Sequence, residues 1–89
     1  MPEINQIKVK TFYTIEVKVK TKYKTYLSDF CDMSQNYIHF QGVETEEAQE
    51  PPTFLDEADT ILKNGNKVEV YYPWTSVVNI DLKRLLKKQ

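Results

Sequence analysis

A period-two alternation of residue types runs from residue 7 to residue 23. The odd positions carry Ile, Val, Thr and Tyr, whereas the even positions are mainly Lys. This pattern is typical of β-strands with one buried face and one face in water. A single strand of this length would span roughly 55 Å at ~3.3 Å per residue, which is too long for a small domain. We therefore predict that a bend or break within residues 11–14 divides the segment.

The segment VYYPWTSVVNI, residues 70–80, would be one buried strand without Pro73 and Trp74. Proline gives a sheet no N–H donor. We therefore predict two strands, residues 67–72 and 76–81, that meet at a sharp corner.

Two further strand candidates, residues 24–30 and 36–43, are separated by a polar turn at residues 31–35. Three leucines follow the last strand at helical spacing and predict a frayed helical turn. They are Leu82, Leu85 and Leu86.

A short helix is predicted between the third and fourth strands. Residues 44–52 read as an acidic, proline-ended loop, and Thr53 can cap a helix over residues 54–63. Asn-Gly-Asn at residues 64–66 supplies its end. The apolar face of this helix comprises Phe54, Leu55, Ala58, Ile61 and Leu62. The economical architecture is a five-stranded, strongly bent sheet.

The net charge of −1 averages two different regions. Residues 44–63 hold seven acidic and one basic residue, which gives −6, and the other positions hold six acidic and eleven basic residues, which gives +5. A basic body with an acidic insert can meet a polyanion on one side. No apolar run reaches the ~20 residues of a membrane span, and the amino terminus lacks the apolar core of a signal peptide. We therefore expect a cytoplasmic protein without a membrane partner.

Two of these segments resemble the sequence signatures of the Sm-like protein family. In FCDMSQNYIHF, Asp32 is followed four residues later by Asn36 and then by an apolar strand. In VYYPWTSVVNI, an apolar strand, a two-residue corner and two polar residues precede Val77 and Val78. The bacterial host-factor branch of the family is similar in its Ser/Thr pair and double valine. The resemblance covers residues 13–40 and 68–81, roughly half of the chain.

The resemblance implies an all-β fold, with one Sm-like domain over residues 1–89 built as a five-stranded, strongly bent, SH3-like open barrel. The acidic loop and short helix, residues 44–66, would be an insert between strands three and four. In this family the fourth and fifth strands pair with neighbouring copies, which closes homo-oligomeric rings of about five to seven subunits. The interface residues implied for this chain are Val68, Val70, Tyr72, Trp74, Val77, Val78 and Ile80.

Rings of this family bind single-stranded RNA at the inner rim, so the resemblance also implies RNA contacts. Ser34 falls at the stacking position, Asn36 at the base-reading position, and Pro73-Trp74 where Arg-Gly is usual. The chain therefore lacks the family's arginine, and Ser34 cannot stack on a base. The residues implied for RNA binding are Asp32, Ser34, Asn36, Tyr72 and Trp74.

Several of these side chains have structural roles as alternatives. Asn36 can hydrogen-bond its own turn, since Asn is a routine turn residue. Tyr72 and Trp74 can stack on bases or pack against a neighbouring subunit or the barrel end. A row of lysines can contact phosphates or serve solubility and edge protection. This row comprises Lys18, Lys20, Lys22 and Lys24.

No residue pattern in the sequence indicates catalysis, a cofactor or a metal. His39 has no second histidine and no thiolate pair to complete a metal site. Cys31 lacks an activating base, and as the only cysteine it cannot form an internal disulfide. No glycine loop that could cradle phosphates is present. We therefore expect a protein that is not an enzyme.

Three functions remain open at this point. The first is a homo-oligomeric ring that binds single-stranded RNA, which the two signatures and the basic body favour. The second is a structural or adaptor ring without RNA binding, in which the acidic loop docks another protein. The third is a monomeric SH3-like module for protein–protein interaction.

Overall fold

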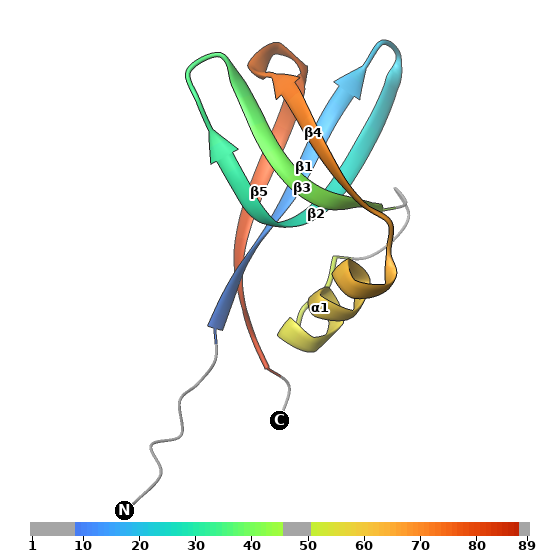
Figure 1. Cartoon of the computed structure of the whole chain (residues 1–89), viewed down its shortest axis with the longest axis vertical. Coiled ribbons are helices and arrows are strands. Elements are labelled where there is room, and N and C mark those ends of the chain that lie inside the picture. Colours follow the sequence, from blue (N-terminus) through green and yellow to red (C-terminus); the bar gives the residue numbers. More distant parts are fainter. Residues whose placement is uncertain (1–8, 46–50, 88–89) are drawn as a thin grey trace, which may run out of the picture.

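The structure is a computed structural model that describes residues 9–45 and 51–87. Five antiparallel strands form one open sheet in the order β4-β3-β2-β1-β5, with one α-helix packed on it (Figure 1). The elements are β1 Val9–Val19, β2 Lys22–Met33, β3 Tyr37–Thr45, α1 Leu55–Asn64, β4 Lys67–Pro73, the 3₁₀ helix η1 Trp74–Ser76 and β5 Val77–Leu86. The predicted order of five strands with one helix between the third and the fourth is therefore confirmed, as is the corner at Pro73 and Trp74. The predicted strand start at Ile7 and the loop acids Glu46, Glu47 and Glu50 lie outside the described residues.

The first hairpin corrects the predicted division of the alternating segment. β1 runs without a break through residues 11–14, and the chain turns instead at Lys20 and Thr21. Val19 pairs with Lys22, so the loop has two residues. The strand is not over-long, because this turn folds the segment back on itself.

Two clusters of buried side chains lie on opposite faces of the sheet. The helix-side core packs beneath α1 and comprises Phe12, Leu27, Val43, Leu55, Ala58, Leu62 and Leu85. The inner core comprises Ile15, Val17, Tyr26, Ile38 and Phe40. Side chains from both edge strands, β4 and β5, pack against the inner core, so the sheet curls around it. Phe12 is thus buried on a face that the alternation assigned to water, because α1 covers that face.

The carboxyl-terminal strand replaces the predicted helical turn. β5 continues to Leu86 and pairs with β1 as far as Val9. Pairing along this length supplies hydrogen bonds to the backbone, whereas one isolated helical turn carries the full cost of nucleation. Leu85 is buried in the helix-side core, and Leu82 and Leu86 are exposed.

Helix α1 begins differently from the prediction and ends as predicted. Phe54 is the N-cap, and Thr53 does not cap the helix with its side chain. The first-turn carboxylate of Glu57 instead accepts a hydrogen bond from the backbone N–H of Thr53 at 3.2 Å. At the other end, the N–H of Gly65 bonds to the carbonyl oxygen of Ile61 at 2.9 Å. A Cβ atom at Gly65 would clash with Val43, so the close approach of helix and sheet requires glycine. Among the described residues, no helix has the length and hydropathy needed to cross a bilayer.

A buried serine fixes the bulge in the middle of β2. The pairing of β2 with β3 shifts register between Ser28 and Phe30, and Ser28 is fully buried there. Its Oγ atom lies 2.5 Å from the carbonyl oxygens of both Phe30 and Gln41 and accepts the N–H of Phe30 at 3.1 Å.

We expect Ser28→Ala to lower the free energy of unfolding by about 1 to 3 kcal/mol, because the N–H of Phe30 and a carbonyl oxygen would lose their partner in a buried place. Chemical denaturation measures this change. Thr60→Ala, which removes a hydroxyl from the exposed side of α1, is the matched control and should change stability by less than about 0.5 kcal/mol. Equal losses in the two variants would contradict this role of Ser28.

Candidate functional site

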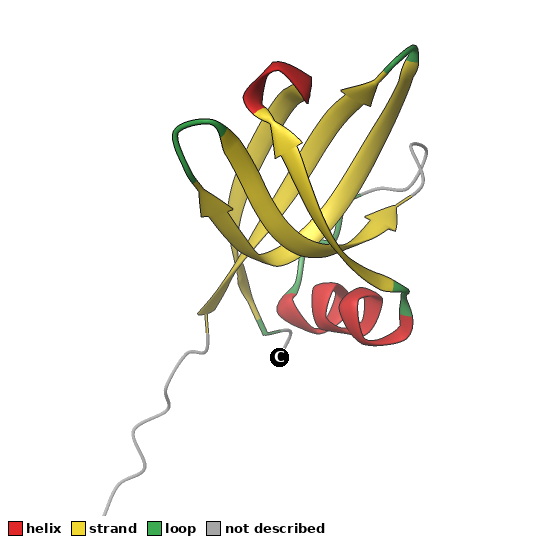
Figure 2. Cartoon of the chain, turned by 45° about the horizontal axis from the view of Figure 1, so that its top comes forward, coloured by secondary structure: helices red, strands yellow, loops and turns green. Residues whose placement is uncertain are grey.

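Three connections gather at the end of the sheet away from α1 (Figure 2). They are the β1–β2 turn at residues 20–21, the β2–β3 turn at residues 34–36, and η1 at residues 74–76. We call this region the loop end. It contains the two segments that the Sm-like resemblance assigns to one nucleotide site.

One hydrogen bond joins two of these connections. The indole N–H of Trp74 donates to the backbone carbonyl oxygen of Ser34 at 2.8 Å, although the two residues are 40 positions apart. Ser34 also closes its own turn, because its hydroxyl donates to the carbonyl oxygen of Tyr37 at 2.8 Å. The turn and the corner are therefore held at a fixed separation.

Four of the five residues implied for RNA binding fall into two groups. Asp32 and Asn36 are exposed, and within the described part of the chain their side chains make no hydrogen bond or ion pair. Tyr72 and Trp74 are half-buried against the inner core. The hydroxyl of Tyr72 lies 3.0 Å from that of Tyr26, so it faces inward. Ser34, not Asn36, closes the turn, and the Asn36 amide remains at the surface.

The residues implied for the oligomer interface lie along both edges of the sheet. All except Val78 pack partly against the chain's own inner core. Val78 is 49% exposed and sits where the pairing of β5 with β1 skips one residue. Within the described sheet, β4 pairs with β3 alone and β5 with β1 alone. Each edge strand therefore keeps one row of unpaired backbone groups.

The tip of the first hairpin is basic, whereas most charged residues of α1 are acidic. Lys18, Lys20 and Lys22 are exposed at the tip of the first hairpin, whereas Lys24 lies 3.9 Å from Glu44 in an ion pair. Helix α1, at the opposite end, carries the acids Asp56, Glu57 and Asp59 (Figure 1). The tip of the first hairpin is therefore a local cluster of positive charge, and further exposed bases, Lys63, Lys83 and Arg84, lie toward the end with α1.

Lys20 has an unusual backbone conformation. Its φ angle is 60°, the one positive value at a non-glycine residue in the described ranges. This conformation favours glycine and costs other residues roughly 1 kcal/mol. The residue with this strained backbone, Lys20, lies in the two-residue turn at the tip of the basic hairpin.

Two hollows lie against the described sheet. The larger, about 460 Å³, opens beside β4 and is lined in part by Tyr26, Tyr72, Lys24 and Glu44. Burial, and then the hydrogen bond with Tyr72, raise the pKa of Tyr26 well above its usual value. The phenol of Tyr26 therefore stays neutral near neutral pH and can exchange hydrogen bonds with a ligand but cannot act as a base.

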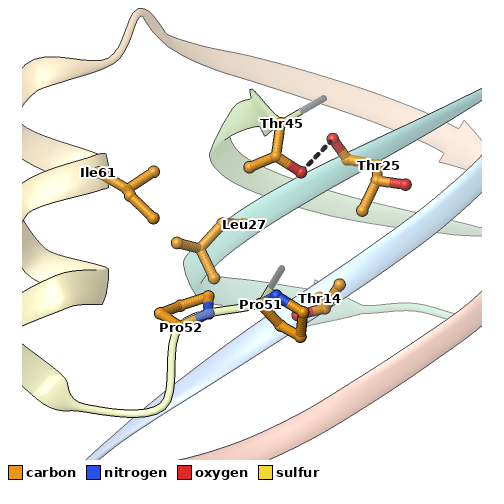
Figure 3. Close-up of a pocket in the computed structure, with 7 residues that line it drawn as sticks. All are labelled: Thr14, Thr25, Leu27, Thr45, Pro51, Pro52 and Ile61. Atoms are coloured by element: carbon orange, nitrogen blue, oxygen red, sulfur yellow. Dashed lines mark hydrogen bonds between the residues drawn. The ribbon is translucent and has the colours of Figure 1, made fainter. Parts of the chain in front are cut away.

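The smaller hollow, about 140 Å³, lies between the sheet and α1 (Figure 3). Leu27 and Ile61 face it from two sides, and Thr45 donates a hydrogen bond to the carbonyl oxygen of Thr25 at 3.3 Å. Its wall ends at Thr45 and Pro51, on either side of residues 46–50, so we assign no ligand to it.

Cys31 is expected to react slowly with thiol reagents in the folded protein. Burial, and then the negative charge of Asp32, raise the pKa of its thiol, and the thiolate is the reactive form. Labelling with a chromogenic disulfide at pH 7 should be slower in the folded chain than after denaturation. Equal rates in the two states would contradict this prediction.

The sequence did not indicate a row of side chains on the outer face of β2, β3 and β4. Phe30, His39 and Tyr71 come from three strands and form ring contacts across them. From the sequence alone, the role that His39 suggests for testing is that of a metal ligand. No cluster of three or more potential metal ligands occurs in residues 9–45 and 51–87. Alternation within each strand indicates which side chains share a face. The row across three strands can be recognised only when the register between the strands is known.

Comparison with protein families, curated proteins and solved structures finds no significant match to this chain.

Proposed function

We propose that this protein is an Sm-like, non-catalytic, homo-oligomeric ring that binds single-stranded RNA at the loop end. The observation that carries the proposal is the hydrogen bond from Trp74 to Ser34. It fixes the β2–β3 turn and the β4–β5 corner side by side, as the family's nucleotide site requires. The exposed amide of Asn36 and the basic hairpin tip belong to the same end.

The topology supports the ring. The order β4-β3-β2-β1-β5, with a 3₁₀ corner between β4 and β5, is the order expected of an SH3-like open barrel in this family. Its two edge strands are unpaired in the single chain. Pairing β4 of one copy with β5 of the next would satisfy both rows of backbone groups and cover Val78.

The side chains suggest how such a site would bind RNA. Lys18, Lys20 and Lys22 would contact phosphates, and the amide of Asn36 would hydrogen-bond a base edge. Trp74 holds the corner against the β2–β3 turn instead of offering a stacking surface, because its N–H donates to Ser34 and its side chain packs partly against the inner core. Without the family's arginine, we expect weak base preference and strong dependence on salt.

Fluorescence anisotropy with labelled oligo-U tests this proposal. Three lysine contacts give a slope of about −2 in a plot of log affinity against log salt, so a fourfold rise in salt should weaken binding roughly twentyfold. Lys22→Ala should weaken binding at low salt. Lys63→Ala, which removes an exposed lysine from the end of α1, is the control and should not. Absence of binding at low salt, or equal losses in both variants, would overturn the RNA site.

Lys20→Gly should have two opposite effects. Relief of the positive φ should raise the free energy of unfolding by about 1 kcal/mol. Loss of one phosphate contact should weaken oligo-U binding and make the salt slope shallower by about 0.7. Denaturation and anisotropy on the same preparation measure both. A variant that is more stable and binds RNA as well as the wild type would show that Lys20 does not contact RNA.

A second candidate is a structural or adaptor ring without RNA binding. The packing of Trp74 and the involvement of Ser34 in its own turn favour it, because neither residue is free to hold a base. In this case the acidic residues near α1 would dock another protein. Trp74→Ala would then change the mass of the assembly and have little effect on any RNA binding. Unchanged mass with lost RNA affinity would exclude this candidate.

A further inference from the structure

The outer face of the sheet has a covered half and a bare half. Near α1, the side chains of Leu27 and Val43 lie under the helix in the helix-side core. Beyond the bulge at residues 28–30, no described residue covers the same face of β2, β3 and β4. The side chains there are Phe30, Asp32, Tyr37, His39, Glu69 and Tyr71, which we call the outer aromatic patch.

The rings of this patch are held in a row by contacts across the strands. His39 stacks on Tyr71 with ring centroids 4.2 Å apart and an angle of 8° between planes. Phe30 meets His39 edge to face at 5.9 Å, and Tyr37 contacts Tyr71 at 5.6 Å. Nevertheless, Phe30 remains 49% exposed and Tyr71 58%. The patch therefore offers aromatic surface to solvent with little freedom of movement.

The charges of the patch are negative. Glu69 accepts a hydrogen bond from the amide of Gln41 at 2.9 Å and lies 3.6 Å from Nε2 of His39. The hydrogen bond from Gln41, and then the contact with His39, lower the pKa of Glu69, so the carboxylate is ionised at neutral pH. Asp32 lies opposite His39 in the register of β2 and β3, and its side chain is exposed. Lys67, on the same face of β4 as Glu69 and Tyr71, pairs with Asp29 at 3.7 Å.

We propose that the outer aromatic patch docks an arginine-bearing segment of a partner protein. A guanidinium group stacks flat on an aromatic ring and donates hydrogen bonds to a carboxylate at the same time. The exposed face of Tyr71 and the carboxylate of Glu69 supply these two partners on adjacent residues of β4's outer face. The carboxylate of Glu69 disfavours a nucleic acid at this position, because a phosphate would meet a negative charge. This surface does not depend on the lysines that the RNA site requires.

A labelled peptide of alternating arginine and serine, titrated with the full chain, tests the proposal. Tyr71→Ala should weaken binding about tenfold and Glu69→Gln about threefold. A lysine–serine peptide should bind more weakly than the arginine peptide, because an ammonium group cannot stack flat. Both variants alter exposed side chains, so thermal denaturation should show that they remain folded.

Two control variants locate the peptide. Tyr23→Ala removes a similarly exposed tyrosine from the first hairpin, and Asp56→Asn removes a negative charge from α1. Both should bind the arginine peptide as the wild type does. Equal weakening by Asp56→Asn and Glu69→Gln would indicate general attraction to acidic residues and overturn the proposal. If Tyr71→Ala loses oligo-U binding but keeps peptide binding, the patch is a base-stacking surface. That result would also overturn the proposal of arginine docking.

Discussion

Replacing Phe12 by alanine is expected to lower the free energy of unfolding by about 3 to 5 kcal/mol. Phe12 is 2% exposed and joins β1 to α1 through the helix-side core. A domain of this size has about 4 to 13 kcal/mol of stability in total, so this one change could remove most of it.

The matched control is Phe30→Ala, which deletes the same side chain from an exposed position on β2. It should cost less than about 1 kcal/mol. Urea denaturation of both variants measures the difference. If the two losses are equal, Phe12 does not fill a buried core between the sheet and α1, and the position of the helix is wrong.

Phe40→Ala should have a comparable effect, a loss of about 3 to 5 kcal/mol, through the other core. Phe40 is fully buried on β3, and its ring contacts Tyr26 edge to face at 5.2 Å and stacks with Tyr72 at 6.2 Å. Removal of this ring would leave a cavity in the inner core, around which the sheet curls. It would also remove the contact between Phe40 and Tyr72 that joins β3 to β4.

Near-ultraviolet circular dichroism provides a second measurement for this variant. The tyrosine signal should fall even under conditions where the far-ultraviolet spectrum still shows folded strands, because Tyr26 and Tyr72 lose their common neighbour. If Phe40→Ala keeps both the near-ultraviolet tyrosine signal and wild-type stability, the sheet does not curl around a core that contains Phe40.

The strands could be predicted from the sequence, whereas their exact limits depended on features that alternation does not show. The turn at Lys20 and Thr21 contains neither glycine nor asparagine, and the lysine alternation continues through it to Lys24. The two-residue loop nevertheless shifts the inner face from odd positions on β1, such as Ile15, to even positions on β2, such as Tyr26. The sequence therefore has no signal at the point where the chain turns. The burial of Phe12 could not be predicted for a related reason: alternation assumes one buried face, but α1 covers part of the second face.

The corner at Pro73 could be predicted because proline has no N–H donor, a local property of one residue. The hydrogen bond between Trp74 and Ser34 could not, since it joins residues 40 positions apart. The outer aromatic patch was missed for the same reason. Its rings come from three strands, and their alignment depends on the bulge at Ser28, which a buried hydroxyl holds in place.

The mass of the full chain in solution, measured by light scattering at micromolar concentration, tests the central proposal most directly. The unpaired edges of β4 and β5 predict one closed species whose mass is a small multiple of 10.5 kDa. A single species of 10.5 kDa would contradict the ring and would favour a monomeric SH3-like interaction module.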